Sequence, residues 1–349
     1  MDDAVGAPGT VRGVQPPDDR AAEGGILIRW GLLGTARINR RLVPAMRAAG
    51  RSTVVAVASR EPSRAEAFAR DWDIPHAVGS YVGLLNRDDV TAIYIPLPNS
   101  LHVEWTLKAV DAGKHVLCEK PMALDAAGVD RIAAAATRAG VTVEEGFMYR
   151  HEPLTARVLE LVRDGAVGAV RAIVSGFTYA QGRPNDVRLD AALGGGALFD
   201  VGCYPVSYAC LLAGKDAMAA TGIARLTPAG VDEEFTGVLG FPAGVTASIY
   251  AGFRAAYRTW LEVMGSEGAL TVSNPFKPGP VEPLRLERLG ETRTIDVRGS
   301  ATHFTREVEH FAATVLDGGP PTVTLDESRR SAAALAALHA AAHSREGRL

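Results

Sequence analysis

Two short segments of the sequence carry side chains that can donate a proton or polarise an oxygen atom. In the first, Lys120 stands between Glu119 and Pro121, directly after an apolar run. In the second, Asp200 and Tyr204 stand four residues apart in a helix-like stretch, so we expect them to share one helix face. Pro121 restricts the backbone of the lysine before it, which would hold the ammonium in place. We interpret these groups as a candidate acid–base site.

Each of these residues also has an ordinary structural interpretation. A lysine that follows a strand is commonly a solvated loop residue. Asp200 would then be a first-turn anion that the helix dipole stabilises, and Tyr204 a half-buried packing residue. Pro205 removes a backbone donor from the same helix and leaves its local geometry open.

The first half of the chain alternates strand-like and helix-like segments, and this alternation would position Lys120. Strands joined by helices of this length form right-handed βαβ units and a parallel sheet. Ligands bind outside the carboxyl ends of such strands, which is where Lys120 falls. The predicted strands cover residues 26–30, 53–58, 92–96, 115–118 and 141–144, and the predicted helices cover 36–49, 62–71, 101–112 and 125–138. We predict a doubly wound α/β domain over residues 26–148.

Beyond residue 150 the alternation stops and longer strands predominate. We expect strands at 170–179, 237–241, 245–253, 260–264 and 269–272, and helices at 153–163, 193–213, 303–316 and 325–342. Grouped strands of this kind predict a second α+β domain with an open, mainly antiparallel sheet over residues 149–349. Its C-terminal helix could pack back on the first domain.

Composition limits the class of protein. The 349 residues are 47% apolar with a net charge of −3, which suits two domains but supplies no field for nucleic acid. No stretch approaches the roughly 18 unbroken apolar residues of a membrane span. Three cysteines favour a reducing compartment. Residues 1–25 lack an apolar block, so we expect a disordered tail and a cytoplasmic protein without membrane contact.

A glycine turn follows the first predicted strand. In Gly31-Leu32-Leu33-Gly34-Thr35-Ala36, Gly31 would permit a tight turn, Gly34 a close backbone approach to phosphate, and Ala36 close helix–strand packing. The pattern departs from G-x-G-x-x-G, so a merely structural turn remains an alternative. We expect Thr35 and Arg37 to share in cofactor binding.

The end of the second predicted strand bears on the choice of cofactor. Proteins that bind NAD place an acidic residue there, whereas this chain has Ser59 and Arg60. A hydroxyl and a guanidinium suit a 2′-phosphate, and Arg64 lies one helical turn later. The alternative is a capping serine followed by a solvated arginine. We predict NADP (NADPH) rather than NAD.

Taken in order, the segments GLLGTA, IPLPNSLHVEW, AGKHVLCEKP and GGGALFDVGCYP resemble the glucose–fructose oxidoreductase, inositol dehydrogenase and rhizopine-catabolism family (Gfo/Idh/MocA). The resemblance runs from about residue 28 to the C-terminus. It implies a Rossmann domain, a second domain with an open antiparallel sheet, and hydride exchange between a nicotinamide and a sugar or polyol. It also implies a homo-oligomer, dimer or tetramer, formed through the C-terminal sheet.

The resemblance also assigns site residues. Lys120 matches the catalytic lysine and Asp200 an active-site acid. Tyr204 matches a position that holds tyrosine in the dihydrodiol, xylose and ketosugar branches and histidine in inositol dehydrogenases. The cofactor contacts it implies, beyond the glycine turn, are Tyr81, Leu97, Asn99, His102, Glu119, Lys120, Arg188 and Asp200. Tyr179, with Lys120 and Tyr204, is expected to meet substrate. Ala36 replaces a usual glycine, and Asn39 stands where a small residue is common.

Elementary electrostatics suggests how the pair would work. A free tyrosine has a pKa of about 10, and lowering a pKa by one pH unit takes about 1.4 kcal/mol. An ammonium close to Tyr204 would lower that pKa towards neutrality. We therefore assign Tyr204 as the acid–base group and Lys120 as the group that tunes it and polarises the substrate oxygen. The exchanged assignment remains open.

These observations predict an NADP-dependent sugar oxidoreductase, and we favour an aldose 1-dehydrogenase of the xylose-dehydrogenase type. A ketosugar reductase acting on a nucleotide-linked deoxysugar is the close alternative. A non-catalytic NADP-binding regulatory protein is an alternative of another class. His339 and His343 have metal-compatible spacing but no third ligand in view, so we expect no metal.

Overall fold

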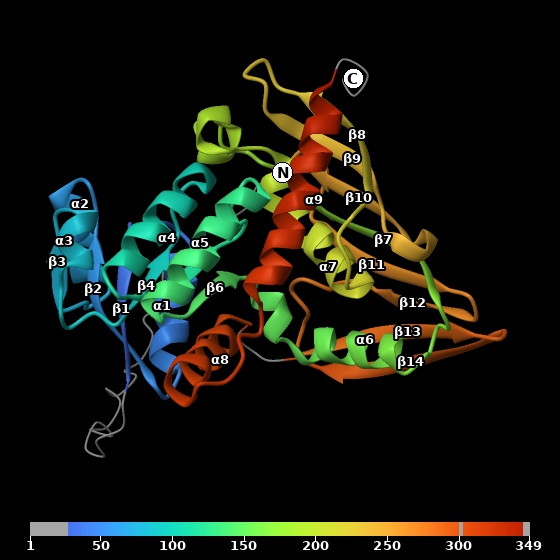
Figure 1. Cartoon of the computed structure of the whole chain (residues 1–349), viewed down its shortest axis with the longest axis horizontal. Coiled ribbons are helices and arrows are strands. Elements are labelled where there is room, and N and C mark those ends of the chain that lie inside the picture. Colours follow the sequence, from blue (N-terminus) through green and yellow to red (C-terminus); the bar gives the residue numbers. More distant parts are fainter. Residues whose placement is uncertain (1–26, 300–302, 345–349) are drawn as a thin grey trace, which may run out of the picture.

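The computed structural model describes residues 27–299 and 303–344, so the predicted tail lies outside the described residues. Two sheets organise this part of the chain, with six and eight strands. Figure 1 shows the smaller sheet with its helices at one end of the molecule and the larger sheet at the other. The expected architecture, a doubly wound parallel sheet followed by a mainly antiparallel one, is confirmed.

The first sheet has the strand order β3-β2-β1-β4-β5-β6 and is parallel throughout. This is the order of the dinucleotide-binding Rossmann fold. Its strands are β1 (Ile28–Leu33), β2 (Ser52–Ala58), β3 (His76–Val78), β4 (Ala92–Ile95), β5 (His115–Glu119) and β6 (Val143–Gly146). The helices are α1 (Asn39–Ala48), α2 (Pro62–Asp71), α3 (Tyr81–Leu85), α4 (His102–Asp111) and α5 (Ala126–Ala139), with a 3-10 turn η2 (Asn99–Leu101) before α4. β4 and β6 are buried along their whole length because helices cover both faces of the sheet.

The second sheet has the order β14-β13-β12-β11-β7-β10-β9-β8. All its pairs are antiparallel except β7 with β10, which run parallel. The strands are β7 (Val170–Thr178), β8 (Ala219–Leu226), β9 (Asp232–Gly240), β10 (Thr246–Gly252), β11 (Arg258–Gly265), β12 (Gly268–Val272), β13 (Val281–Arg288) and β14 (Glu291–Arg298). The remaining elements are η3 (Met148–His151), α6 (Pro153–Arg163), η4 (Val187–Leu189), η5 (Ala191–Leu193), the π-helix η6 (Leu198–Gly202), α7 (Cys203–Ala213), η7 (Pro242–Gly244), α8 (His303–Asp317) and α9 (Leu325–His343).

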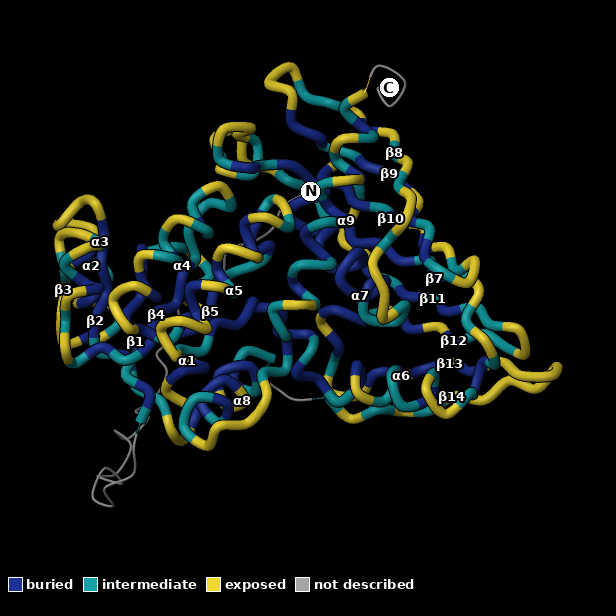
Figure 2. Tube along the Cα trace, in the orientation of Figure 1, coloured by how far each residue is buried: buried dark blue, intermediate teal, exposed yellow. Residues whose placement is uncertain are grey.

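One face of the larger sheet is covered and the other is open. Along β9, Phe235 and Leu239 are buried, whereas Val238 between them is 40% exposed. Helices α6, α7 and α9 contact the covered face, and Figure 2 shows the buried interior along that side. This alternation is typical of a sheet with one solvated face.

The two C-terminal helices join the domains. Helix α9 lies between α5 and β8, and α8 packs against α1. Phe311 of α8 also reaches strand β1, where its ring lies 5.0 Å from that of Trp30. The last part of the chain therefore packs on the Rossmann sheet as well as on the second domain.

Two sequence-based expectations about elements are corrected. The first strand does not end at Trp30 but runs on to Leu33, so Gly31 lies inside β1 and not in the turn. A Cβ on Gly31 would crowd Val90 and Ile93 at 3.0–3.1 Å, so this glycine serves packing and not phosphate binding. The turn begins at Gly34, which has a φ of 116°.

The predicted helix over residues 193–213 is also wrong at its start. Residues 191–193 form η5, a glycine turn follows, and the chain enters α7 through the π-helix. A Cβ on Gly195 would collide with the carbonyl of Arg188, and one on Gly196 with the carboxylate of Asp232. The glycines are therefore required by close approach of other segments.

By length and composition alone, residues 191–213 also reach the threshold for a membrane-spanning helix. Most of this stretch is buried inside the molecule, against β7 and β10. Core helices of globular proteins pass the same test, so its apolar character is explained by packing.

Candidate active site

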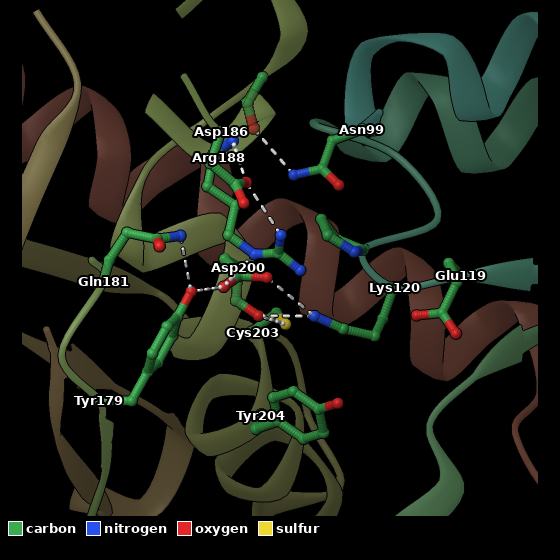
Figure 3. A network of polar contacts seen from close by, with 12 residues as sticks. Asn99, Glu119, Lys120, Tyr179, Gln181, Asp186, Arg188, Asp200, Cys203 and Tyr204 are labelled. Atoms are coloured by element: carbon green, nitrogen blue, oxygen red, sulfur yellow. Dashed lines mark hydrogen bonds and ion pairs between the residues drawn. The ribbon is translucent and has the colours of Figure 1, made fainter. Parts of the chain in front are cut away.

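Lys120 extends from the end of β5 towards the π-helix. Its Nζ donates to the carbonyl oxygen of Asp200 at 2.7 Å and to Oδ1 of the same residue at 3.3 Å. Both side chains are about nine-tenths buried. Figure 3 shows the ammonium directed at Asp200, with the carboxylate of Glu119 on its other side. The peptide bond from Lys120 to Pro121 is cis.

Asp200 is the centre of a wider polar network. Its Oδ2 accepts from Nε of Arg188 at 2.8 Å and from the hydroxyl of Tyr179 at 2.9 Å. Burial alone would raise the pKa of Asp200, but the charges of Lys120 and Arg188 hold it below its usual value. Gln181 extends the network, with Nε2 3.5 Å from the Tyr179 hydroxyl (Figure 3). The structure therefore brings together Lys120, Asp200, Tyr179 and Arg188.

The π-helix accounts for the free carbonyl that Lys120 uses. In the π register, the carbonyl of residue i faces the N–H of residue i+5. For Asp200 that residue is Pro205, which has no N–H. The carbonyl instead accepts from Lys120 and from the thiol of Cys203, whose Sγ is 3.4 Å away. The sequence left the effect of Pro205 on this helix open. In the structure, its missing N–H leaves the carbonyl of Asp200 available to Lys120.

Tyr204 lies beneath Lys120, with Nζ 5.0 Å from the centroid of its ring. Its hydroxyl is directed at Sδ of Met148, 3.8 Å away, and not at the ammonium. Four aromatic rings surround it with centroids 5.3–6.1 Å from its own; they belong to Phe147, Tyr149, Phe177 and Phe276. The two groups expected to act together are therefore neighbours.

The expected lowering of the Tyr204 pKa is not found. Burial among the rings raises the pKa of Tyr204, and the opposing effect of Lys120 is smaller. Burial likewise lowers the pKa of Lys120, but the negative charge of Asp200 and any charge on Tyr204 outweigh it, so this pKa is raised. At neutral pH the site holds a neutral phenol beside an ammonium.

The turn after β1 fits the diphosphate of a dinucleotide. Gly34 occupies a left-handed conformation, and its open side faces Leu97 and the hydroxyl of Tyr81. Asn39 closes the loop, because its Nδ2 donates to the carbonyl of Gly34 at 2.8 Å. The Oδ1 of the same buried side chain has no partner among the described residues. The first turn of α1 carries no acid, so its N–H groups can meet an anion.

The end of β2 carries Ser59 and Arg60, the two residues from which NADP was predicted. Ser59 is buried and its hydroxyl accepts from the N–H of Glu61 at 3.2 Å. Glu61 is the N-cap of α2 and no side chain caps this helix, so the alternative of a capping serine is wrong. Arg60 is exposed, and its charge acts on the hydroxyl of Tyr81. Because Arg60 is exposed and Ser59 is buried, a 2′-phosphate bound at this strand end would contact Arg60 more readily than Ser59.

Two residues expected to contact the cofactor form hydrogen bonds within the protein. His102 has no exposed surface, and its ring nitrogens lie 2.7 and 2.8 Å from the carbonyls of Leu97 and Pro121. It joins the loop after β4 to the loop after β5. The carboxylate of Glu119 accepts from the hydroxyl of Tyr94 at 2.6 Å. These hydrogen bonds connect segments around Lys120, and contact of either residue with the cofactor stays a prediction.

The remaining expected contacts lie where the two domains meet. Arg37 forms an ion pair with Asp186 at 3.0 Å, and Asp186 also accepts from Arg188. Nδ2 of Asn99 donates to the carbonyl of Gly194 at 2.8 Å (Figure 3). Thr35 and Ala36 stay partly accessible in the turn. These contacts lie between the turn after β1, where the dinucleotide is expected, and the polar network around Asp200.

Sequence reasoning missed the aromatic wall around Tyr204 and the contact with Met148. Phe177 and Phe276 come from strands and loops far apart in the chain, so only their apolar type could be read in advance. Among the described residues, no group of histidine, cysteine or acidic side chains could hold a metal ion. His339 and His343 stack on each other with centroids 3.9 Å apart.

Comparison with known proteins supplies the family. Residues 28–147 match the description "Oxidoreductase family, NAD-binding Rossmann fold", and residues 155–271 match "GFO/IDH/MocA C-terminal domain". The chain belongs to the Gfo/Idh/MocA family. The predicted family and the predicted oxidoreductase class are thereby confirmed for this Gfo/Idh/MocA protein.

Characterised relatives of this Gfo/Idh/MocA protein act on different sugars. A D-xylose 1-dehydrogenase (NADP(+)) of Haloferax volcanii is 38% identical over 86% of this chain and 92% of its own. A dTDP-3,4-didehydro-2,6-dideoxy-alpha-D-glucose 3-reductase of Streptomyces violaceoruber is also 38% identical, over 90% of this chain and 92% of its own.

Solved structures give the same picture. A 3-ketoreductase from Actinomadura kijaniata, in complex with NADP and TDP-benzene, is 34% identical with a TM-score of 0.83. The match covers 92% of this chain and 98% of that one. Other structures of that ketoreductase carry a lysine replaced by alanine or glutamate, or a tyrosine replaced by phenylalanine.

Proposed function

We propose that this protein uses NADPH to reduce the keto group of a nucleotide-linked sugar. The observation that carries this proposal is the placement of the Lys120 ammonium over the ring of Tyr204, where Asp200 holds it. Lys120 is an ammonium held by Asp200, and Tyr204 is a phenol whose pKa is raised by burial. Both groups are in the form that donates a proton, which reduction of a ketone requires.

The reaction would divide between the cofactor and this chain. NADPH supplies the hydride when bound. As the hydride reaches the carbonyl carbon, the π electrons of the C=O bond move to oxygen and form an alkoxide. Lys120 stabilises this charge, and Tyr204 gives the alkoxide its proton and later regains one from water. In the exchanged assignment, Lys120 donates the proton and Tyr204 orients the sugar.

Asp200 and Tyr179 would hold this arrangement. Asp200 fixes the ammonium through two oxygens, and Tyr179 donates to the same carboxylate from the end of β7. Because a defined acceptor pair restricts the lysine, less conformational freedom is lost when substrate binds. Tyr179 is proposed to line the space for the bound sugar.

The relatives support the same assignment. In the Actinomadura ketoreductase, the replaced lysine and tyrosine are separated by as many positions as Lys120 and Tyr204 are here. The preference for NADP over NAD is supported by Arg60 at the end of β2, where an acid would oppose a 2′-phosphate. Gly34, Thr35, Ala36 and Arg37 are proposed to cradle the diphosphate.

An aldose 1-dehydrogenase of the xylose type is the second candidate, which the relative from Haloferax volcanii favours. It would use the same residues in reverse, with Tyr204 or Lys120 accepting a proton from the sugar hydroxyl. The site residues can serve either direction, because a group that donates a proton in reduction accepts one in oxidation.

Parallel assays decide between the two candidates. The protein with NADPH is offered TDP-linked ketosugars, and with NADP⁺ it is offered D-xylose and other free aldoses, with the absorbance of NADPH as readout in both. Turnover of a ketosugar without turnover of an aldose is expected. Turnover of aldoses alone would reject the proposal, and NADPH binding without turnover in either assay would favour a regulatory protein.

We also propose that copies of this chain associate through the open face of the larger sheet. Ile223 on β8 and Val238 on β9 expose apolar surface there, at 45% and 40%. The Val238→Arg variant should shift the mass measured by light scattering towards the monomer; an unchanged mass would rule out this face.

A further inference from the structure

Lys277 lies close to the proposed site on a loop that sequence reasoning did not consider. The loop joins β12 to β13, and Phe276 at its centre is fully buried with its ring 5.3 Å from that of Tyr204. Prolines flank the pair at positions 275 and 278, which limits the backbone. The residue next to Phe276 is therefore held at a fixed place beside the aromatic wall.

The ammonium of Lys277 covers that wall. Its Nζ is 5.4 Å from the centroid of Phe177, whose ring is 5.4 Å from the ring of Tyr204. Lys120 stands over Tyr204 in the same way, at 5.0 Å. Two ammonium groups thus lie over two adjoining rings. The pKa of Lys277 is lowered, first by partial removal from water and then by the positive charge of Lys120 and of Arg41 on α1. The negative charge of Asp200 opposes this lowering but does not outweigh it.

Unlike the neighbouring cations, Lys277 forms no ion pair with a carboxylate among the described residues. Arg37, Lys120 and Arg188 share Asp186 and Asp200. Within residues 27–299 and 303–344, no carboxylate forms an ion pair with Lys277, and part of its side chain stays open to solvent. A cation near other cations gains most from an anion that is brought in by a ligand.

We propose that Lys277 binds a phosphate oxygen of the substrate, on the side of the site that the second domain forms. This inference rests on the proposed function, because it assigns the diphosphate of the nucleotide-linked sugar to a named residue. The loop leaves the aromatic wall next to Tyr204, where the sugar would lie. On the other domain, Arg37 stands beside the turn at Gly34 and Arg60 stands at the end of β2, so the cofactor phosphates have cations there. A free sugar offers Lys277 no charge to pair with.

Thymidine diphosphate is the probe that tests this assignment without turnover. Its dissociation constant would be measured by calorimetry with the NADPH-saturated protein, for the wild type and for Lys277→Met and Lys277→Arg. A hydrogen bond to a charged group is worth about 1.5–3 kcal/mol, so we expect the methionine variant to bind about 10- to 100-fold more weakly. The arginine variant should stay within about threefold of the wild type, because it keeps the charge.

Two controls complete the experiment. Lys215→Met removes another exposed lysine, in the loop between α7 and β8, and should leave binding of thymidine diphosphate unchanged. The dissociation constant of NADPH should stay within about twofold in every variant. Weaker NADPH binding by Lys277→Met with unchanged diphosphate binding would overturn the proposal and make this lysine a cofactor contact. Unchanged binding of both ligands, or no diphosphate binding by the wild type, would overturn it as well.

The outcome is separable from that of the proposed function. If no ketosugar is reduced and diphosphate binding still depends on Lys277, the proposed reaction fails while the binding assignment stands. If ketosugars are reduced and Lys277→Met has wild-type affinity, the reaction stands and this assignment fails.

Discussion

Asp186 and Asp200 form ion pairs with three cations between them, and this sharing sets the geometry of the site. Arg188 donates to both acids, Arg37 pairs with the first and Lys120 with the second. Loss of Asp200 would leave the buried ammonium of Lys120 without its carboxylate partner, which is costly. The network therefore fixes Lys120 before any substrate arrives.

Arg60 is the residue on which the cofactor preference should depend. We predict that Arg60→Ala raises KM for NADPH by about tenfold or more, because a charge-assisted contact with the 2′-phosphate is lost. KM for NADH should change little, since NADH lacks that phosphate. Steady-state kinetics with both cofactors checks this, and Arg70→Ala, which removes an exposed arginine from the last turn of α2, is a matched control. A parallel rise in both KM values would contradict the assignment.

At the scale of single residues, the sequence predicted which residues form the site better than it predicted what surrounds them. Lys120, Asp200 and Tyr204 stood out because they occupy ordered motifs that resemble a known family. The register of the glycine turn was misjudged because Gly31 and Gly34 look alike until the strand end is known. The pKa of Tyr204 was misjudged because the rings around it come from distant segments.

Among the elements, the π-helix has the largest effect on the site. It places Pro205 opposite the carbonyl of Asp200, and the missing N–H leaves this oxygen to Lys120. Periodicity could not reveal it, since the stretch 197–213 is apolar around the helix apart from Asp200 and Ser207 and fits any helix type. The expected continuous helix failed at its start for the same reason.

Pro205→Ala tests this role. The new N–H would compete for the carbonyl of Asp200, so we expect kcat to fall by about tenfold and the pH profile of kcat to shift, with little change in KM for NADPH. Pro153→Ala, at the start of α6, is the control and should keep wild-type kinetics. If Pro205→Ala matches this control in kcat and in its pH profile, Pro205 has no positioning role.

Across the whole molecule, acids are buried where the domains meet. Glu144 and Glu145 on β6 are at most 2% exposed, and burial raises the pKa of each to about 7. One oxygen of each has no partner among the described residues. The sequence showed both glutamates but gave no sign of their burial, because the covering helices α8 and α9 come from the other end of the chain.

Glu144 should make stability depend on pH. The folded state keeps its proton up to about pH 7 and the unfolded state only to about 4.5, so folding binds a proton between these values. Stability from this group is therefore greatest below about pH 4.5 and falls as the pH rises to about 7, by up to about 1.4 kcal/mol per pH unit. The free energy of unfolding, measured with urea at about pH 5 and pH 8, should fall less between these two pH values for Glu144→Gln than for the wild type. The exposed Glu309→Gln is the control, and an equal loss in all three proteins would contradict this interpretation.

The most direct test of the central claim is the single-turnover rate of ketosugar reduction by NADPH, followed across pH in the wild type and in Tyr204→Phe. We predict a wild-type rate that is flat from about pH 6 to pH 9, because the donor stays protonated, and a loss of about 100-fold or more in Tyr204→Phe with unchanged NADPH affinity. A Tyr204→Phe rate within about twofold of the wild type would show that this phenol is not the proton donor.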